Sequence, residues 1–335
     1  MKKIIVSVLL VFSFYSTFAQ DAKELHETGR TFMMQGDYPN AILVLNRAIA
    51  LQPDNIEIAK DLALNYYFSG NYTKAQEIIK PLLDREDADD QCYQIAGDIY
   101  LAQDNTKDCE KLYKKGIKKF PNSGSLYNEY GKLMWAQKNY DAIKMWEKGI
   151  EVSPSFSKNY FNACKFYYFS TDKVWSIIYG EIFLNMEPMS TSSPEIKTIL
   201  LESYKKLFAD TDVAKNNKEN NPFVTAFLQT IFKQSNVVTT GINTDNLIML
   251  RSRFILDWFS ENANKFPNRL FDWQKQLLQE GVFEAYNHWI FTAAQNLPAY
   301  QTWTSTHNTE YTELTRFQKG RIFKIPAGQY YNGKN

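Results

Sequence analysis

Apolar and small residues between residues 22 and 189 follow a helical spacing that is interrupted by a short turn and then resumes. From Leu25, such residues stand at i, i+3, i+4 and i+7, which places them on one face of an α-helix. The same kind of spacing runs from Ala41 to Ala48 after the turn. The pattern therefore predicts two antiparallel helices, with small residues such as Gly29 where the two backbones approach each other.

Turn residues stand where helix pairs require them. Gly36 and Gly70 follow the first helix of two copies of the pattern, and glycine adopts the left-handed conformation of a helix C-cap without steric cost. A proline cannot continue a helix, and one closes the second helix of four copies. These prolines are Pro53, Pro121, Pro154 and Pro188. Turn chemistry and apolar spacing thus agree on helix pairs.

The whole pattern returns about every 34 residues. It divides into five approximate copies: residues 22–55, 56–89, 90–123, 124–156 and 157–189. The fourth copy is one residue shorter in its turn, and the fifth matches at fewer positions. A repeat of this length indicates an array of stacked helix pairs.

The repeated positions resemble those of the tetratricopeptide repeat family. The resemblance implies an all-α fold, in which residues 22–189 form a right-handed α-solenoid of about five helix pairs. It also implies that the first helix of each pair lines a concave groove. A non-enzymatic scaffold or adaptor that binds a protein or peptide in this groove is the function that the resemblance favours.

Carried onto this chain, the resemblance places large apolar residues one helical turn before the end of each first helix. They are Met33, Tyr67, Leu101, Trp135 and Tyr168, with Phe68 and Phe169 beside them. The polar groove residues are Arg30, Lys132, Lys158, Asn162 and Lys165. Two interpretations stay open: a ridge exposed to a partner, or a row covered by the next repeat and the C-terminal region.

One branch of the family grips the terminal carboxylate of a peptide with Lys and Asn at fixed positions. His26 and Arg30 stand at those positions in the first copy, and Leu64 fills the equivalent place in the second. Binding of a chaperone tail is therefore not expected.

Residues 1–19 have the pattern of a secretory signal peptide. Two lysines precede an apolar run from Ile4 to Phe14, and Thr17 and Ala19 are small residues just before a cleavage point. The run is shorter than the roughly 20 apolar residues that span a bilayer; an uncleaved anchor is the alternative. We expect an exported protein, periplasmic or secreted, with no membrane span after cleavage.

Charge and cysteine usage narrow the function further. The chain has 38 Lys and Arg against 37 Asp and Glu, and loss of Lys2 and Lys3 with the signal peptide leaves a formal charge of −1. A nucleic-acid partner is not expected, since phosphate binding requires clustered positive charge. Cys109 and Cys164 take positions that usually hold small buried residues. Cys92 and Cys109 are not expected to form a disulfide.

Residues 190–319 lose the repeat register but keep helical spacing, and they resemble no family. Ser193 and Pro194 predict a helix start, whereas the polar stretch 210–221 predicts an exposed loop. Dense Phe and Trp predict a packed all-helical domain. Its boundary with the array lies near Ser190 or within the polar stretch, and residues 320–335 are expected to be a tail.

Two other functions stay open. Aromatic rings such as Trp135 and Tyr168 can stack on sugars, which suits a glycan-binding protein of the cell envelope. Glu284 and His288 stand four residues apart and could supply an acid and a base for a hydrolytic site. Such a pair commonly only supports a helix. The three histidines are scattered and no phosphate-binding glycine loop is present, so we expect neither a metal nor a cofactor.

Overall fold

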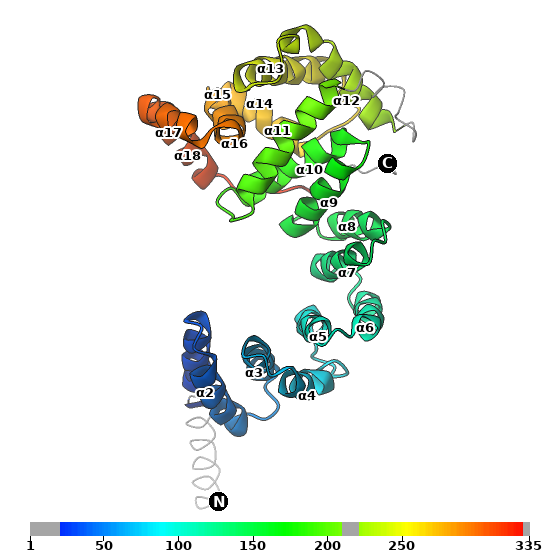
Figure 1. Cartoon of the computed structure of the whole chain (residues 1–335), viewed down its shortest axis with the longest axis vertical. Coiled ribbons are helices and arrows are strands. Elements are labelled where there is room, and N and C mark those ends of the chain that lie inside the picture. The colour runs from blue at the N-terminus through cyan, green and yellow to red at the C-terminus, as the bar shows by residue number, and fades with distance from the viewer. Residues whose placement is uncertain (1–20, 210–220, 331–335) are drawn as a thin grey trace, which may run out of the picture. The chain divides into compact units, whose positions relative to one another are not determined.

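The computed structural model describes residues 21–209 and 221–330, and these residues form helices and no strand (Figure 1). The predicted all-α solenoid is confirmed. The predicted signal peptide, most of the predicted polar loop and the last residues of the predicted tail lie outside the described residues. Among the described helices, none has both the length and the apolar character that crossing a bilayer requires.

Contacts divide the chain into two units, residues Met1–Pro121 and Asn122–Asn335. The division falls within the predicted repeat array, and the predicted boundary near Ser190 lies inside the second unit.

The first unit is a succession of helices packed in chain order. A helix over residues 21–34 is followed by α2 (Tyr38–Leu51), α3 (Ile56–Phe68), α4 (Tyr72–Leu82), α5 (Asp90–Ala102) and α6 (Thr106–Lys119). Apolar residues of neighbouring helices form a core cluster: Leu45 and Ala48 of α2 pack with Ile58 and Leu62 of α3. The predicted helix pairs are therefore present, and each helix from α2 to α6 packs against its neighbours in the chain.

The turn inside each of the first four pairs has a left-handed residue, as predicted for the first two. Gly36 and Gly70 have φ of 76° and 79°, as expected of a helix C-cap. The third and fourth copies carry Asp104 and Lys138 at this point, with φ of 57° and 59°. The turn is thus kept by the backbone even where glycine is absent, at a cost in strain.

Small residues are needed where the two helices of a pair meet. A Cβ atom added to Gly97 of α5 would lie 2.2 Å from the hydroxyl oxygen of Tyr113 in α6. Tyr113 is fully buried. The glycine therefore makes room for the aromatic ring of the facing helix.

The second unit begins with repeat helices and continues into the C-terminal helices. Its elements are α7 (Gly124–Ala136), α8 (Ala142–Val152), α9 (Ser157–Phe169), α10 (Lys173–Met186), α11 (Ser193–Ala209), α12 (Pro222–Phe232), the 3-10 helix η1 (Ser235–Val238), α13 (Thr244–Glu261), α14 (Arg269–Gln279), α15 (Phe283–Asn287), the π-helix η2 (His288–Thr292), α16 (Ala293–Gln295), α17 (Leu297–Thr306) and α18 (Asn308–Gly320).

Helix α10 explains why the repeats and the C-terminal helices form one unit. It is the second helix of the fifth predicted repeat, yet it is buried on all sides from Val174 to Asn185. It packs against α9 and α11 and also against α12 and α14. Trp175 of α10 stacks on Phe223 of α12, with ring centroids 5.6 Å apart. The last repeat helix therefore serves as the central helix of the C-terminal helices.

All three cysteines are buried, as predicted for Cys109 and Cys164, and none of them forms a disulfide. Burial raises the pKa of the Cys92 thiol to about 11 and that of Cys164 to about 12. Both thiols therefore stay protonated and unreactive near neutral pH.

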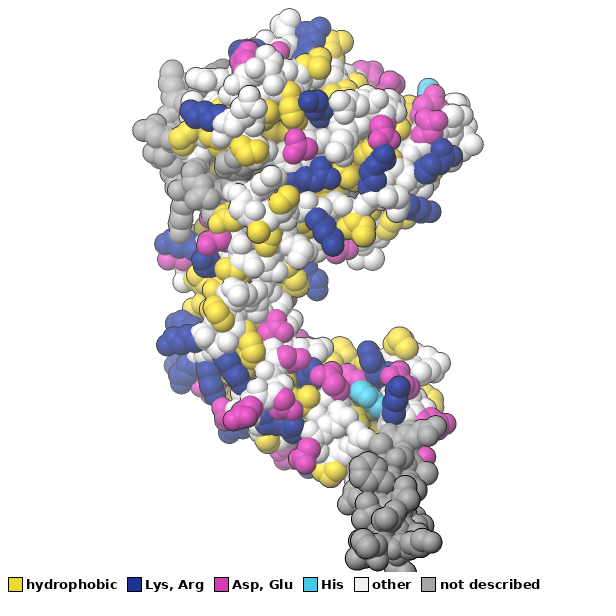
Figure 2. All heavy atoms as spheres, turned by 180° about the vertical axis from the view of Figure 1, so that it is seen from behind, with side chains coloured by type: hydrophobic (Ala, Val, Ile, Leu, Met, Phe, Trp, Pro, Cys, Tyr) yellow, Lys and Arg dark blue, Asp and Glu magenta, His cyan; other side chains and the backbone are white. Residues whose placement is uncertain are grey.

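The described part of the predicted tail is packed rather than loose. Phe323 and Ile325 are buried, and the ring of Phe323 lies 5.4 Å from that of Trp273 in α14. On the face shown in Figure 2, positive and negative side chains are interspersed over much of the described surface.

Candidate functional site

The predicted groove residues fall in both units, so each set is considered on its own unit. The first unit holds Arg30, Met33, Tyr67, Phe68 and Leu101; the second holds Trp135, Tyr168, Phe169, Lys132, Lys158, Asn162 and Lys165. All twelve side chains are at least partly exposed, none being in the buried class.

Met33, Met34, Tyr67 and Phe68 define the N-terminal aromatic patch, at the ends of the first helices of repeats one and two. Phe68 is 48% exposed and Met34 is 79% exposed. The ring of Phe68 lies 5.3 Å from that of Tyr67 and stacks at 5.3 Å on Tyr38, the first residue of α2. The ring of Phe68 is thus in contact with two aromatic neighbours while a large part of it faces solvent.

Trp135, Tyr168 and Phe169 define the C-terminal aromatic patch. Phe169 is 70% exposed and lies 5.1 Å from the ring of Tyr168. The amine of Lys206 lies 3.7 Å above the Tyr168 ring, in a cation–π contact. Trp135 is half-buried, with its ring 5.5 Å from that of Phe166. Phe169 is therefore the most open ring of this patch.

The polar residues predicted for the first unit are paired within it. The Oδ2 atom of Asp61 lies 2.7 Å from Nε2 of His26 and 3.7 Å from Nε of Arg30. This contact joins the first helices of repeats one and two. His26 and Arg30 therefore link the first repeat to the second.

The polar residues predicted for the second unit are largely paired as well. Asn162 donates a hydrogen bond of 2.8 Å to Oδ1 of Asn128, and Lys165 lies 2.6 Å from Glu195. Lys132 pairs with Glu129 at 2.6 Å, while Lys158 is exposed. A partner that binds Lys132, Asn162 or Lys165 must compete with these internal contacts. A partner that packs on the exposed part of an aromatic ring breaks no ion pair.

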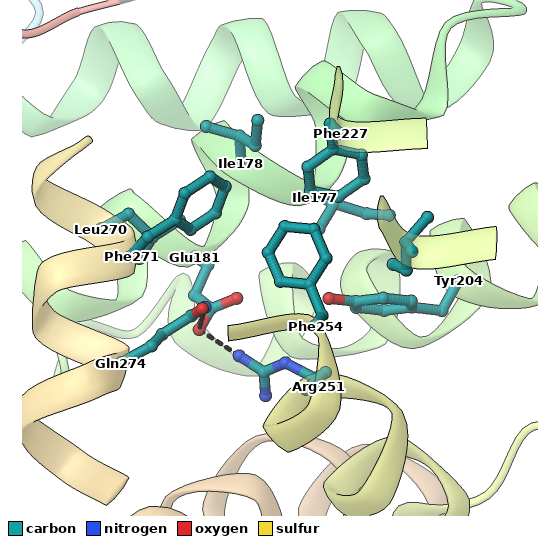
Figure 3. Close-up of a pocket in the computed structure, with 11 residues that line it drawn as sticks. Ile177, Ile178, Glu181, Tyr204, Phe227, Arg251, Phe254, Leu270, Phe271 and Gln274 are labelled. Atoms are coloured by element: carbon teal, nitrogen blue, oxygen red, sulfur yellow. Dashed lines mark hydrogen bonds and ion pairs between the residues drawn. The ribbon is translucent and has the colours of Figure 1, made fainter. Parts of the chain in front are cut away.

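A buried polar network lies beneath the second unit's surface, and sequence analysis missed it (Figure 3). The guanidinium of Arg251 in α13 forms an ion pair with Glu181 in α10. Gln274 of α14 and the hydroxyl of Tyr286 also donate to the Glu181 carboxylate, at 2.6 Å and 3.0 Å. Arg251 donates further to Asn287. Residues far apart in sequence and without a common motif build this network.

The electrostatics of the network are those of a closed structural site. Arg251 and Glu181 are 2% and 1% exposed. Burial is the largest single effect and opposes the charge of Arg251, but attraction to Glu181, Tyr204 and Tyr286 together outweighs it and leaves the pKa of Arg251 raised. A cavity of about 10 Å³ borders the pair, which is room for no more than one water molecule. The network joins α10, α13, α14 and α15 and has no room for a substrate.

The pair suggested for hydrolysis is part of a stack. Nε2 of His288 lies 4.0 Å from the exposed carboxylate of Glu284, and Nδ1 lies 2.8 Å from the Thr292 hydroxyl. The imidazole face stacks on Trp303 at 4.3 Å. Burial lowers the pKa of His288. These contacts explain the imidazole by packing, and the hydrolytic site stays a prediction.

The helix pairs and their turns define a helical repeat protein that presents exposed aromatic residues. Residues 32–99 match the family model described as tetratricopeptide repeat. Residues 32–99 are therefore tetratricopeptide repeats, as the sequence positions predicted.

Several solved structures are similar to this chain. A tetratricopeptide repeat protein from Parabacteroides merdae is 16% identical, with a TM-score of 0.42 over 78% of this chain and 98% of its own. PilF of Pseudomonas aeruginosa is 13% identical, with a TM-score of 0.48 over 64% and 98%. A thermophilic repeat protein from Thermus thermophilus is 14% identical, with a TM-score of 0.45 over 55% and 98%. No curated protein matches significantly. The family assignment rests on the family model and the helix pairs.

Proposed function

We propose that this protein is a scaffold that binds a protein or peptide through the aromatic patches at the ends of its repeat helices. The tetratricopeptide repeat fold is generally a non-enzymatic interaction scaffold. The observation that carries the proposal is the exposure of large rings at equivalent repeat positions, Phe68 and Phe169. Burial of one such ring on a partner contributes about 1.5–3 kcal/mol.

The ligand that fits is a segment with apolar anchors, either extended or in an amphipathic helix. Rigid aromatic side chains supply contact area at a low entropic cost and commonly dominate binding energy. Phe68 contacts the rings of Tyr38 and Tyr67, and Phe169 contacts that of Tyr168. Their positions are therefore set before a partner arrives.

The test is affinity capture from the cell envelope with the tagged chain lacking residues 1–19. Two variants remove the open rings, Tyr67→Ala with Phe68→Ala, and Tyr168→Ala with Phe169→Ala. A matched control replaces two apolar residues exposed elsewhere, Met249 and Leu256, by alanine. We expect a protein that the wild type and the control recover to be lost, about tenfold or more, with one ring variant. If both ring variants recover the same proteins as the wild type in the same amounts, the proposal is rejected.

Export is part of the proposal and rests on the signal-peptide pattern of residues 1–19. Cell fractionation tests it directly. A chain of full mass in the cytoplasmic fraction would contradict export without bearing on the aromatic patches.

A further inference from the structure

Helix α6 carries an excess of positive charge on its solvent face. It contains six lysines and two acidic residues. Lys107, Lys111, Lys114 and Lys118 stand at i, i+4, i+7 and i+11. This spacing aligns them along one side of the helix over about 16 Å. These four residues are the lysine stripe.

The stripe is fully on the surface. All six lysines of α6 are exposed, whereas the opposite side of the helix buries Cys109, Leu112, Tyr113 and Gly116. In Figure 2, positive side chains gather at the left, at the place that α6 takes after the turn from Figure 1. The folding of α6 therefore does not depend on the stripe.

Internal ion pairs neutralise the stripe only in part. Lys111 lies 3.1 Å from Asp108 and Lys114 lies 2.6 Å from Glu110, while Lys107 and Lys118 form no ion pair with any described residue. The pKa of Asp108 is lowered, chiefly by a hydrogen bond from Asn105 and next by Lys111. The positive charge of Lys80 in α4 lowers it further by a smaller amount. Lys80 therefore adds its positive charge beside the stripe.

The arrangement is unfavourable for the helix by itself. Four pairs of lysines stand at i and i+4 in α6, and like charges at this spacing repel. Only Lys118 and Lys119, in the last turn, gain from the helix dipole. An external anion that binds this surface would relieve the repulsion between the lysines.

The residue types of this face indicate which anion it fits. The exposed residues of α6 are its six lysines with Thr106 and Asp108, so the face has no aromatic residue, arginine or apolar residue. A specific protein interface is built around such residues, and single-stranded nucleic acid uses aromatic stacking. Lysine is a compact, hydrated point charge. A plane of lipid phosphates requires nothing more than such charges.

We propose that the lysine stripe is a membrane-surface site, through which the first unit associates electrostatically with a bilayer of anionic phospholipids. Lys107, Lys111, Lys114 and Lys118 lie against the headgroups, and no side chain enters the hydrocarbon. This site is separate from the aromatic patches, and neither proposal depends on the other.

The test is co-sedimentation of the chain lacking residues 1–19 with phosphatidylcholine vesicles, with and without phosphatidylglycerol. The stripe variant carries Lys→Gln at residues 107, 111, 114 and 118. The control carries Lys→Gln at four exposed lysines outside α6, Lys144, Lys205, Lys265 and Lys319. Both variants lose the same charge. Circular dichroism verifies that both are folded.

We expect binding only to phosphatidylglycerol vesicles, weakened about tenfold or more in the stripe variant and less than about twofold in the control. Added salt should abolish it. Absence of wild-type binding at low salt, or equal losses in both variants, would overturn the proposal. Binding of polyglutamate or duplex DNA through the stripe, with no binding to vesicles, would also overturn it.

Discussion

Lys197 offers a direct test of how burial acts on charge in the second unit. It lies in α11 and is 9% exposed, with its amine 4.1 Å above the ring of Trp289. No ion pair to a described residue accompanies this contact. Burial lowers the pKa of Lys197 from 10.5 to about 8. At neutral pH the amine is therefore charged in an environment that disfavours charge.

The size and sign of the effect follow from linkage. The unfolded chain binds the proton with a pKa near 10.5 and the folded chain with a pKa of about 8. The penalty is thus fully present below pH 8 and disappears as pH rises through 10.5. A difference of about 2.5 units corresponds to about 3 kcal/mol. The cation–π contact with Trp289 offsets about 0.5–2 kcal/mol of this.

We therefore predict that Lys197→Met increases the free energy of unfolding by about 1–3 kcal/mol at pH 7. At pH 10 the gain should fall below about 1 kcal/mol. The assay is urea unfolding followed by tryptophan fluorescence. All seven tryptophans stand at residue 135 or later, so the signal reports the second unit alone.

Lys205→Met is the matched control, because Lys205 is an exposed lysine of the same helix. Its effect should stay within about 0.5 kcal/mol at both pH values. No stabilisation by Lys197→Met at pH 7 would refute the reasoning. A gain of equal size at pH 7 and pH 10 would show that packing, not charge, causes it.

Two further predictions concern packing and the buried network. Arg251→Met should destabilise the second unit by about 3–5 kcal/mol, because it leaves Glu181 charged and unpaired in the core. Adding Glu181→Leu to this variant should recover part of the lost free energy of unfolding, because it removes the buried charge but also the acceptor of Gln274 and Tyr286. A further loss equal to that of Glu181→Leu alone would contradict the ion-pair account. Gly97→Ala should destabilise the first unit by about 1–3 kcal/mol, since its Cβ would meet the Tyr113 ring. The measurement is the melting temperature followed by circular dichroism. Gly320→Ala is the control, because an added Cβ there meets open space, and it should change the melting temperature little. Equal melting temperatures of the two variants would refute the clash.

Sequence analysis predicted the helix pairs because their signals are local. Apolar spacing, Gly36 and Gly70 at the turns and the closing prolines each act within a few residues of their own position. Repetition of these signals identified the repeat and selected Met33, Tyr67 and Phe169, but it left open whether they are covered; the structure shows them at least partly exposed. The sequence alone could not show which polar groove residues form ion pairs, because Arg30 approaches Asp61 only when the first two repeats stack.

The sequence by itself therefore determined the class of fold, the helix pairs and the positions that the aromatic residues share. Only the tertiary structure decided that α10 is the central helix of the second unit, since burial on all sides depends on α12 and α14 packing against it. It also decided the network of Glu181, Arg251 and Gln274. Arg251 and Gln274 stand 70 and 93 positions from Glu181, and their pairing depends on how the chain folds back on itself rather than on any local pattern.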